Sequence, residues 1–196
     1  MATVGILLAA GRGRRFDPEG ARNKLLALLP SNEPVVAASA RALLAVIPRV
    51  IAVVAPGDDA VGQVLRGAGC DVVVCDDADR GMAASLVHAL RHSLPDAQSW
   101  LVALGDMPHV RTTTIAALCA QLEQGADIAA PVCQGKRGNP VAFSRMYLPD
   151  LLALEGDQGA RAILQTRQVH QVAVDDPGIF YDIDTPSDLQ KTVYFR

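Results

Sequence analysis

The chain has 196 residues, of which half are apolar and a fifth are charged, and its formal net charge at pH 7 is −3. This composition predicts one globular α/β domain with an aliphatic core and excludes an intrinsically disordered chain. The mild acidity argues against a general nucleic-acid-binding protein, whose interface is a basic face. The apolar run near the N-terminus is too short for a signal peptide or a membrane span, so we expect a cytoplasmic protein without a membrane partner.

The first apolar run, residues 4–10, has the length and composition of a buried parallel strand. Gly11 and Gly13 end it and allow backbone amides to close around an anion. Positions 12 to 24 contain five basic residues and only two acidic residues. They are Arg12, Arg14, Arg15, Arg22 and Lys24, against Asp17 and Glu19. This loop therefore predicts a polyphosphate-binding site.

Two common phosphate-binding loops do not fit these residues. A Walker loop would need Gly-Lys-Ser/Thr at its end, and no such run follows Gly13. A dinucleotide-binding fingerprint would need a third glycine at the position of Phe16, and Asp17-Pro18 blocks an immediate helix. From the spacing alone, an ordinary turn between a strand and a helix on a basic surface is an equal alternative.

The rest of the chain alternates between helical and strand patterns. A helix is expected after Pro34, followed by a strand at 49–55, a helix over about 58–66 capped by Asp58, and a strand at 71–75. A helix from Gly81 and a strand at 100–104 continue the series. Such alternation predicts a parallel sheet with right-handed crossovers. Later segments predict a helix at 115–122, strands at 128–132 and 141–143, an edge strand at 169–174, and a short helix from Ser187.

Polar residues follow several of these strands, at the edge where open α/β sheets bind ligands. Asp106 comes just after the strand at 100–104 and suits Mg²⁺, which bridges carboxylates to substrate phosphates. The alternative is an N-cap for the next helix, but the threonines at 112–114 are better placed to cap it.

Two further segments leave alternatives open. The small residues at 81–85 allow a ligand to approach closely, or serve ordinary packing of a helix on the sheet. Lys136 and Arg137, beside Gly138 and Asn139, bind a second anion or form a solvated hairpin turn.

Five motifs in order resemble one family. Leu-Ala-Ala-Gly-Arg-Gly-Arg-Arg-Phe (8–16), followed by Asn-Lys-Leu-Leu (23–26), is similar to the signature loop of the nucleotidyltransferases, which join a nucleotide to a phosphorylated acceptor. The later motifs are Gly-Met-Ala-Ala-Ser-Leu (81–86), Leu-Gly-Asp-Met-Pro (104–108), Arg-Gly-Asn-Pro-Val (137–141) and Asp-Ile-Asp-Thr-Pro (182–186). Together they resemble the molybdenum cofactor cytidylyltransferases, which are MobA-like NTP transferases.

This resemblance implies a three-layer α/β/α, Rossmann-like fold of the nucleotide-diphospho-sugar transferase type, with a mixed, mostly parallel sheet. It also implies a single nucleotidyltransferase domain over residues 1–196. In that domain the residues up to about 110 bind the nucleotide, and those from about 111 bind the acceptor.

The resemblance further implies transfer of CMP from CTP to molybdenum-molybdopterin, with release of pyrophosphate. The alternatives are GMP transfer to the same cofactor, CMP transfer to a phosphorylated sugar or alcohol, and non-catalytic delivery of the cofactor to a molybdenum hydroxylase. A molybdenum hydroxylase or its chaperone is a candidate partner. Ala10 stands where guanylyl-transferring relatives tend to have a second glycine, which favours CTP over GTP.

The resemblance also assigns site residues. Mg²⁺, with Mn²⁺ as an alternative, would bind Asp106 and Asp184, and Asp182 competes for the second position. The residues implied to be catalytic are Lys24, Arg15 and Asp106. Those implied to bind the nucleotide are Leu8, Ala9, Ala10, Gly11, Arg12, Gly13, Arg14, Arg15, Lys24, Ala78, Gly81 and Ser85. Those implied to bind the acceptor are Arg137, Gly138, Asn139, Pro140, Asp157, Gly159 and Arg161. Relatives usually have glycine after the Phe16 position and the lysine sooner, so the longer loop here raises the question of how far Lys24 reaches.

Overall fold

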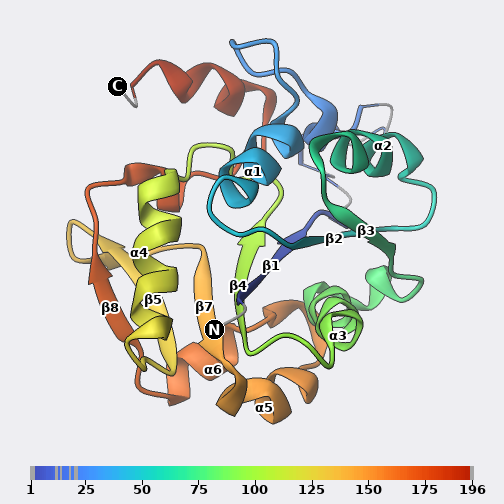
Figure 1. The fold of residues 1–196 in the computed structure, drawn as a ribbon. Helices are drawn as coiled ribbons and strands as arrows, with labels where there is room; N and C mark the ends of the chain where they lie inside the picture. Colours follow the sequence, from blue (N-terminus) through green and yellow to red (C-terminus); the bar gives the residue numbers. More distant parts are fainter. Residues whose placement is uncertain (1–2, 12, 14, 18, 20–21, 195–196) are drawn as a thin grey trace.

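A computed structural model describes residues 3–194 except 12, 14, 18, 20 and 21 (Figure 1). Its centre is an eight-stranded sheet with the order β3-β2-β1-β4-β7-β5-β6, and β8 pairs with β5. The strands are β1 (Thr3–Leu8), β2 (Val50–Val54), β3 (Asp71–Val74), β4 (Ser99–Leu104), β5 (Ile128–Cys133), β6 (Lys136–Arg137), β7 (Val141–Ser144) and β8 (His170–Ala173).

The sheet is mixed but mostly parallel, as expected. β1 is parallel to β2 and β4, β2 to β3, and β5 to β8. Only the short strands β6 and β7 run antiparallel to their neighbours among the described strands. Because β7 runs against β4, with Val141 opposite Val102, the start of β7 lies at the carboxyl-end edge of β4. The segment before β7 therefore reaches the edge where the parallel strands end.

Helices cover both faces of the sheet, which gives the three layers seen in Figure 1. One face carries α1 (Val35–Leu44), α2 (Asp59–Ala68) and α4 (Thr112–Glu123), and the other carries α3 (Met82–Ser93), α5 (Leu148–Leu152) and α6 (Arg161–Thr166). Adjacent side chains of a strand point to opposite faces, so Leu7 and Ile6 of β1 belong to the two different core clusters.

Among the described residues, five short 3₁₀ helices lie between these elements, and a sixth, longer one follows them. They are η1 (Lys24–Leu26), η2 (Ala78–Arg80), η3 (Arg145–Tyr147), η4 (Gly156–Gln158), η5 (Pro177–Phe180) and η6 (Pro186–Tyr194). The last of these corresponds to the helix expected from Ser187. In the described part of the chain, none of the helices combines the length and hydrophobicity needed to cross a bilayer.

Three details differ from the sequence prediction. β1 ends at Leu8 rather than at residue 10, so Ala9 and Ala10 belong to the loop. Asp58 precedes α2 but its side chain does not cap the helix, because it accepts a 3.3 Å hydrogen bond from Asn23 instead. The threonines do not cap α4 either, because they form its first turn, where the Thr114 hydroxyl donates to Asp176 at 2.6 Å.

Candidate active site

Lys24 reaches the carboxyl-end edge of the sheet despite the long loop before it. The Asn23 side chain caps η1 by accepting the Leu25 N–H at 3.0 Å, which fixes the turn that carries Lys24. The Lys24 Nζ donates to Asp106 Oδ2 at 2.6 Å and to Asp184 Oδ1 at 3.1 Å. Its side chain is only 9% exposed, so the two ion pairs lie largely out of water.

Asp106 is positioned by the end of β4. The next residue after this strand, Gly105, donates its N–H to the carbonyl of Leu8 at 2.9 Å and so holds the segment against β1. A Cβ atom at Gly105 would lie 3.1 Å from the Leu8 oxygen, so the close approach favours glycine there. The turn that contains Asp106 therefore lies directly beside the start of the signature loop (residues 8–16).

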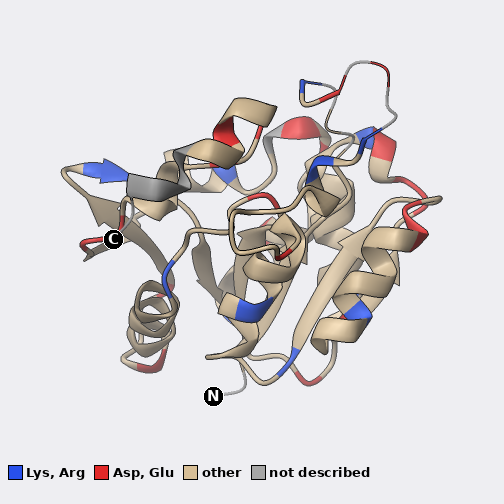
Figure 2. Ribbon diagram, turned by 90° about the horizontal axis from the view of Figure 1, so that it is seen from above, with Lys and Arg blue, Asp and Glu red and all other residues tan. Residues whose placement is uncertain are grey.

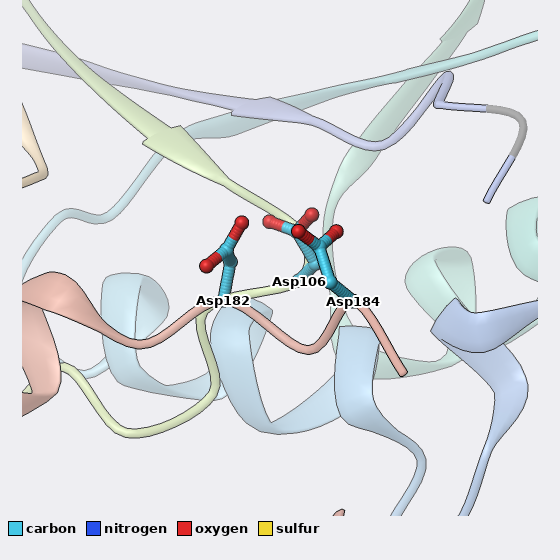
Figure 3. A group of neighbouring side chains, drawn as sticks. All are labelled: Asp106, Asp182 and Asp184. Carbon is cyan, nitrogen blue, oxygen red and sulfur yellow. The ribbon is translucent and has the colours of Figure 1, made fainter. Parts of the chain in front are cut away.

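A second segment, residues 182–184, brings two more carboxylates to Asp106 (Figure 3). The Ile183 N–H donates to the carbonyl oxygen of Asp106 at 2.8 Å, and the Ile183 side chain is buried. One carboxylate oxygen from each of Asp106, Asp182 and Asp184 lies within 4.8 Å of the other two. The Asp188 carboxylate accepts the N–H of Asp184 at 3.1 Å, which fixes the far end of the segment. The sequence left Asp182 and Asp184 as competitors, and the fold brings both to Asp106.

The electrostatics of this cluster favour a bound cation. Burial lowers the pKa of Lys24, but the charges and hydrogen bonds of Asp106 and Asp184 outweigh it, so the pKa is raised. Burial, and then the charge of Asp184, raises the pKa of Asp182. The Asp106 Oδ1 atom is buried and accepts no hydrogen bond from the described residues. Three carboxylates that can act as oxygen ligands, one of them with an oxygen that accepts no hydrogen bond from the described residues, fit a hard divalent metal ion.

Arg15 adds a further cation from the solvent side. Its Nη1 atom lies 2.8 Å from Asp184 Oδ2, and its side chain is 76% exposed. The loop returns on itself through the Phe16 N–H, which donates to the Gly13 carbonyl at 2.9 Å. Gly13 has φ +57°, and a Cβ there would lie 3.3 Å from Lys24 Cγ. Arg12 and Arg14, which the sequence also assigns to the nucleotide, lie outside the described residues.

A cavity of about 630 Å³ opens beside this cluster. Of the twelve residues assigned to the nucleotide from the sequence, eight line it: Leu8, Ala9, Ala10, Gly11, Lys24, Ala78, Gly81 and Ser85. Arg15 and Gly13 do not line it, although both contact cluster residues. Asp79 and Met82 also line it and were not assigned from the sequence. Asp79 lies in the polar loop at 76–80 and Met82 in the small-residue segment at 81–85. The position of these two segments directly after a strand is the sequence signal that could have identified both residues.

A second cavity, of about 690 Å³, adjoins the first, and the two share Leu8, Met82, Leu104 and Asp157. Its lining includes five of the seven residues assigned to the acceptor: Arg137, Gly138, Asn139, Asp157 and Arg161. Pro140 borders a small separate cavity, and Gly159 packs on Met82, so neither lines this one. Apolar side chains that include Leu86, Val102 and Phe143 also line the cavity. Asp157 lies in η4 and does not cap α6, which begins after Ala160.

Acidic and basic residues are interspersed over this part of the molecule. Seen from above, acidic segments lie both near the middle and at the edges of the view, with basic segments among them (Figure 2). Within the site itself, Lys24 pairs with Asp106 and Asp184, and Arg15 pairs with Asp184. Arg137 and Arg161 border the second cavity. The second cavity combines apolar walls with two arginines, which suits a ligand that carries a phosphate group. The first cavity is lined by Lys24 together with three acidic residues, Asp79, Asp106 and Asp157.

Comparisons with known proteins find a matching family model and similar sequences and structures. The family model described as "MobA-like NTP transferase domain" matches residues 5–172. The chain is 30% identical over 119 residues to the purine catabolism protein PucB of Bacillus subtilis, a match that covers 59% of this chain and 57% of PucB. The chain thus spans little more than half of that relative.

Solved structures share the whole fold. Rv0371c of Mycobacterium tuberculosis H37Rv superposes with a TM-score of 0.83 at 29% identity, covering 97% of this chain and 96% of Rv0371c. A complex of Rv0371c with manganese gives a TM-score of 0.79 at 27% identity, covering 97% of both chains. Molybdopterin-guanine dinucleotide biosynthesis protein A of Archaeoglobus fulgidus gives 0.66 at 20% identity, over 96% of this chain and 95% of that one, and this likeness concerns the fold alone.

Proposed function

The chain belongs to the family of MobA-like NTP transferase domains, and from this premise we propose that it transfers CMP from CTP to molybdenum-molybdopterin. Family membership makes it a nucleotidyltransferase, and the choice of CTP and of the acceptor is the proposal. The observation that carries it is the convergence of Lys24, Asp106 and Asp184 beside two adjoining cavities. One cavity would hold the nucleotide and the other the acceptor.

The nucleotide would occupy the first cavity. Its lining combines Lys24 with the loop residues Ala10 and Gly11, whose backbone can approach phosphates closely. Lys24 would neutralise charge that builds up on the α-phosphate and on the leaving pyrophosphate. Arg15, exposed and close to Asp184, would offset charge on the same triphosphate from the solvent side. The small side chains at 78, 81 and 85 leave room for the base.

A divalent metal would be held by Asp106 and Asp184, with Asp182 beside them. The three carboxylates, and the buried Asp106 oxygen without a hydrogen bond from the described residues, support such a site. Rv0371c, a similar structure, has been solved as a complex with manganese, which supports the use of a divalent ion, and we propose Mg²⁺ as the ion used here. When bound, the metal would supply positive charge to the phosphate oxygens.

The acceptor would occupy the second cavity. Leu86, Val102 and Phe143 offer an apolar surface for a flat pterin ring, and Arg137 and Arg161 offer partners for its phosphate. That phosphate is already ionised at neutral pH, so the reaction needs positioning in line with the α-phosphorus more than it needs a general base. Residues from about 111 onward would then bind mainly the acceptor, although Met82, Leu86 and Val102 from the first part also line this cavity.

The direct test is to incubate the purified protein with CTP, Mg²⁺ and molybdenum-loaded molybdopterin. We expect pyrophosphate release that depends on all three, and a cytosine dinucleotide product by mass spectrometry. A protein that binds the cofactor but releases no pyrophosphate with any nucleotide would be a carrier, and the proposal would be wrong.

A further inference from the structure

The ammonium group of Lys24 bridges two of the carboxylates proposed to bind the metal. It lies 2.6 Å from Asp106 Oδ2 and 3.1 Å from Asp184 Oδ1. One positive charge therefore already engages one oxygen of each of two carboxylates that a divalent ion would need. We propose that Lys24 competes with the metal for Asp106 and Asp184, so that the metal binds tightly only together with a triphosphate that attracts the ammonium away. This inference rests on the metal and nucleotide sites of the proposed function.

Burial makes the competition strong. The Lys24 side chain is 9% exposed, and the side chains of both carboxylates are 19% exposed. Charges that close, with little water between them, interact much more strongly than an exposed pair does. A divalent ion placed against the same oxygens would meet the repulsion of the ammonium at short range. A metal ion alone must therefore displace Lys24 without any compensating ligand for the ammonium.

The other cation of the cluster presents a smaller obstacle. Arg15 forms an ion pair with Asp184 Oδ2, and its side chain is 76% exposed, so it can turn into water at low cost. Asp106 Oδ1 accepts no hydrogen bond from the described residues and is free to meet a metal. Among these residues, Lys24 is thus the one whose displacement limits metal binding at Asp106 and Asp184.

The structure also provides a place for the displaced ammonium. Lys24 lines the first cavity, and its side-chain stem passes close to Gly13, where a Cβ would lie 3.3 Å from Lys24 Cγ. In this proposal the ammonium turns from the carboxylates toward that cavity. A triphosphate in that cavity would offer it oxygens in exchange for the carboxylates. Metal and nucleotide binding would then be positively coupled, each strengthening the other by the same factor.

The test measures binding of free Mn²⁺, without nucleotide, by electron paramagnetic resonance. Lys24→Met should bind Mn²⁺ at least about tenfold more tightly than the unmodified protein, which corresponds to about 1.4 kcal/mol. Lys24→Arg keeps the charge and should bind Mn²⁺ about as weakly as the unmodified protein. Arg22→Met is the matched control, because Arg22 lies in the same loop but pairs with Asp17 at 3.7 Å. It should leave Mn²⁺ binding unchanged.

Thermal unfolding gives a second readout. Lys24→Met removes the ammonium that pairs with two largely buried carboxylates, so the variant should unfold at a lower temperature and regain stability on addition of Mn²⁺. The unmodified protein should gain much less from Mn²⁺ alone. Lys24→Gln, which retains a hydrogen-bond donor, serves the same measurements if the methionine variant does not fold.

The outcomes separate this inference from the proposed function. Equal or weaker Mn²⁺ binding in both Lys24→Met and Lys24→Gln would overturn the competition, while metal-dependent turnover could still stand. An unmodified protein that binds no Mn²⁺ even with CTP present would contradict the metal site itself, and with it both proposals.

Discussion

The N–H of Ile183 donates a 2.8 Å hydrogen bond to the carbonyl oxygen of Asp106, and so joins the two segments that carry the acidic cluster. The bond is between backbone groups, so substitutions of the flanking carboxylates leave it in place. The Ile183 side chain is buried in a small apolar cluster with Phe16, which packs the same segment against the signature loop. Substitutions of the carboxylate side chains should therefore leave this backbone contact between the two segments in place, so each side chain can be tested separately.

Asp106→Asn should abolish turnover and leave the fold intact, because the amide lacks the charge that a divalent metal requires. Activity assays, with circular dichroism as the check on folding, measure both. Asp184→Asn should behave alike, whereas Asp182→Asn should retain more activity, since Asp182 is the third member of the cluster. Near-normal turnover in Asp106→Asn would contradict the metal assignment.

Lys24→Ala should lower kcat by about 10²–10³, the usual cost of removing a group that stabilises transition-state charge. CTP binding should weaken far less, so the change should appear in kcat more than in KM. Steady-state kinetics at saturating acceptor separate the two. A change confined to the KM for CTP would mean that Lys24 acts only in ground-state binding.

We predict that the packing of Phe16 holds its neighbour Arg15 and the segment around Ile183 in position. It is 5% exposed and shares a cluster with Ile183, while its neighbour Arg15 pairs with Asp184. Phe16→Ala should cost about 3–5 kcal/mol of stability, and at temperatures where it is folded it should also lower kcat. Phe16→Leu should restore most of both.

The control for Phe16 is a core truncation that leaves the site untouched. Leu90 is fully buried on the α3 face of the sheet and lines neither cavity. Leu90→Ala should lower the unfolding temperature while kcat of the folded protein stays normal. If Phe16→Ala behaves in the same way, Phe16 is structural only.

Arg161→Gln should raise the KM for the acceptor and change the KM for CTP little, because Arg161 lines the second cavity but not the first. Arg167→Gln is the control, since Arg167 follows the same helix but pairs with Asp150 at 3.5 Å outside both cavities. Equal effects of the two substitutions would argue against the second cavity as the acceptor site.

Much of the fold could be predicted from local patterns. Continuous apolar runs predict the buried strands β1, β2 and β4, and helical periodicity predicts α1. Asp106 could be proposed as a metal ligand because it directly follows a strand, and strand ends place side chains at a known edge.

Long-range pairing could not be predicted in this way. Asp182 and Asp184 follow η5, in a stretch without periodicity, and their approach to Asp106 depends on the Ile183 backbone bond. The position of β7 between β4 and β5 likewise depends on pairing between distant segments. The contact of Lys24 with both carboxylates depends on the loop conformation, which spacing alone does not determine.

The choice of base tests the central claim most directly. Ala10 lines the first cavity, and in the proposed site its methyl group would take room beside the base that a purine needs more than a pyrimidine does. We predict that kcat/KM with molybdenum-molybdopterin is higher for CTP than for GTP. Ala10→Gly should narrow the preference without reversing it, because one methyl group contributes about 1–3 kcal/mol, or 10–200-fold. Parallel kcat/KM measurements with the two nucleotides should therefore give a clear preference for CTP, and equal values in the unmodified protein would contradict cytidylyl transfer.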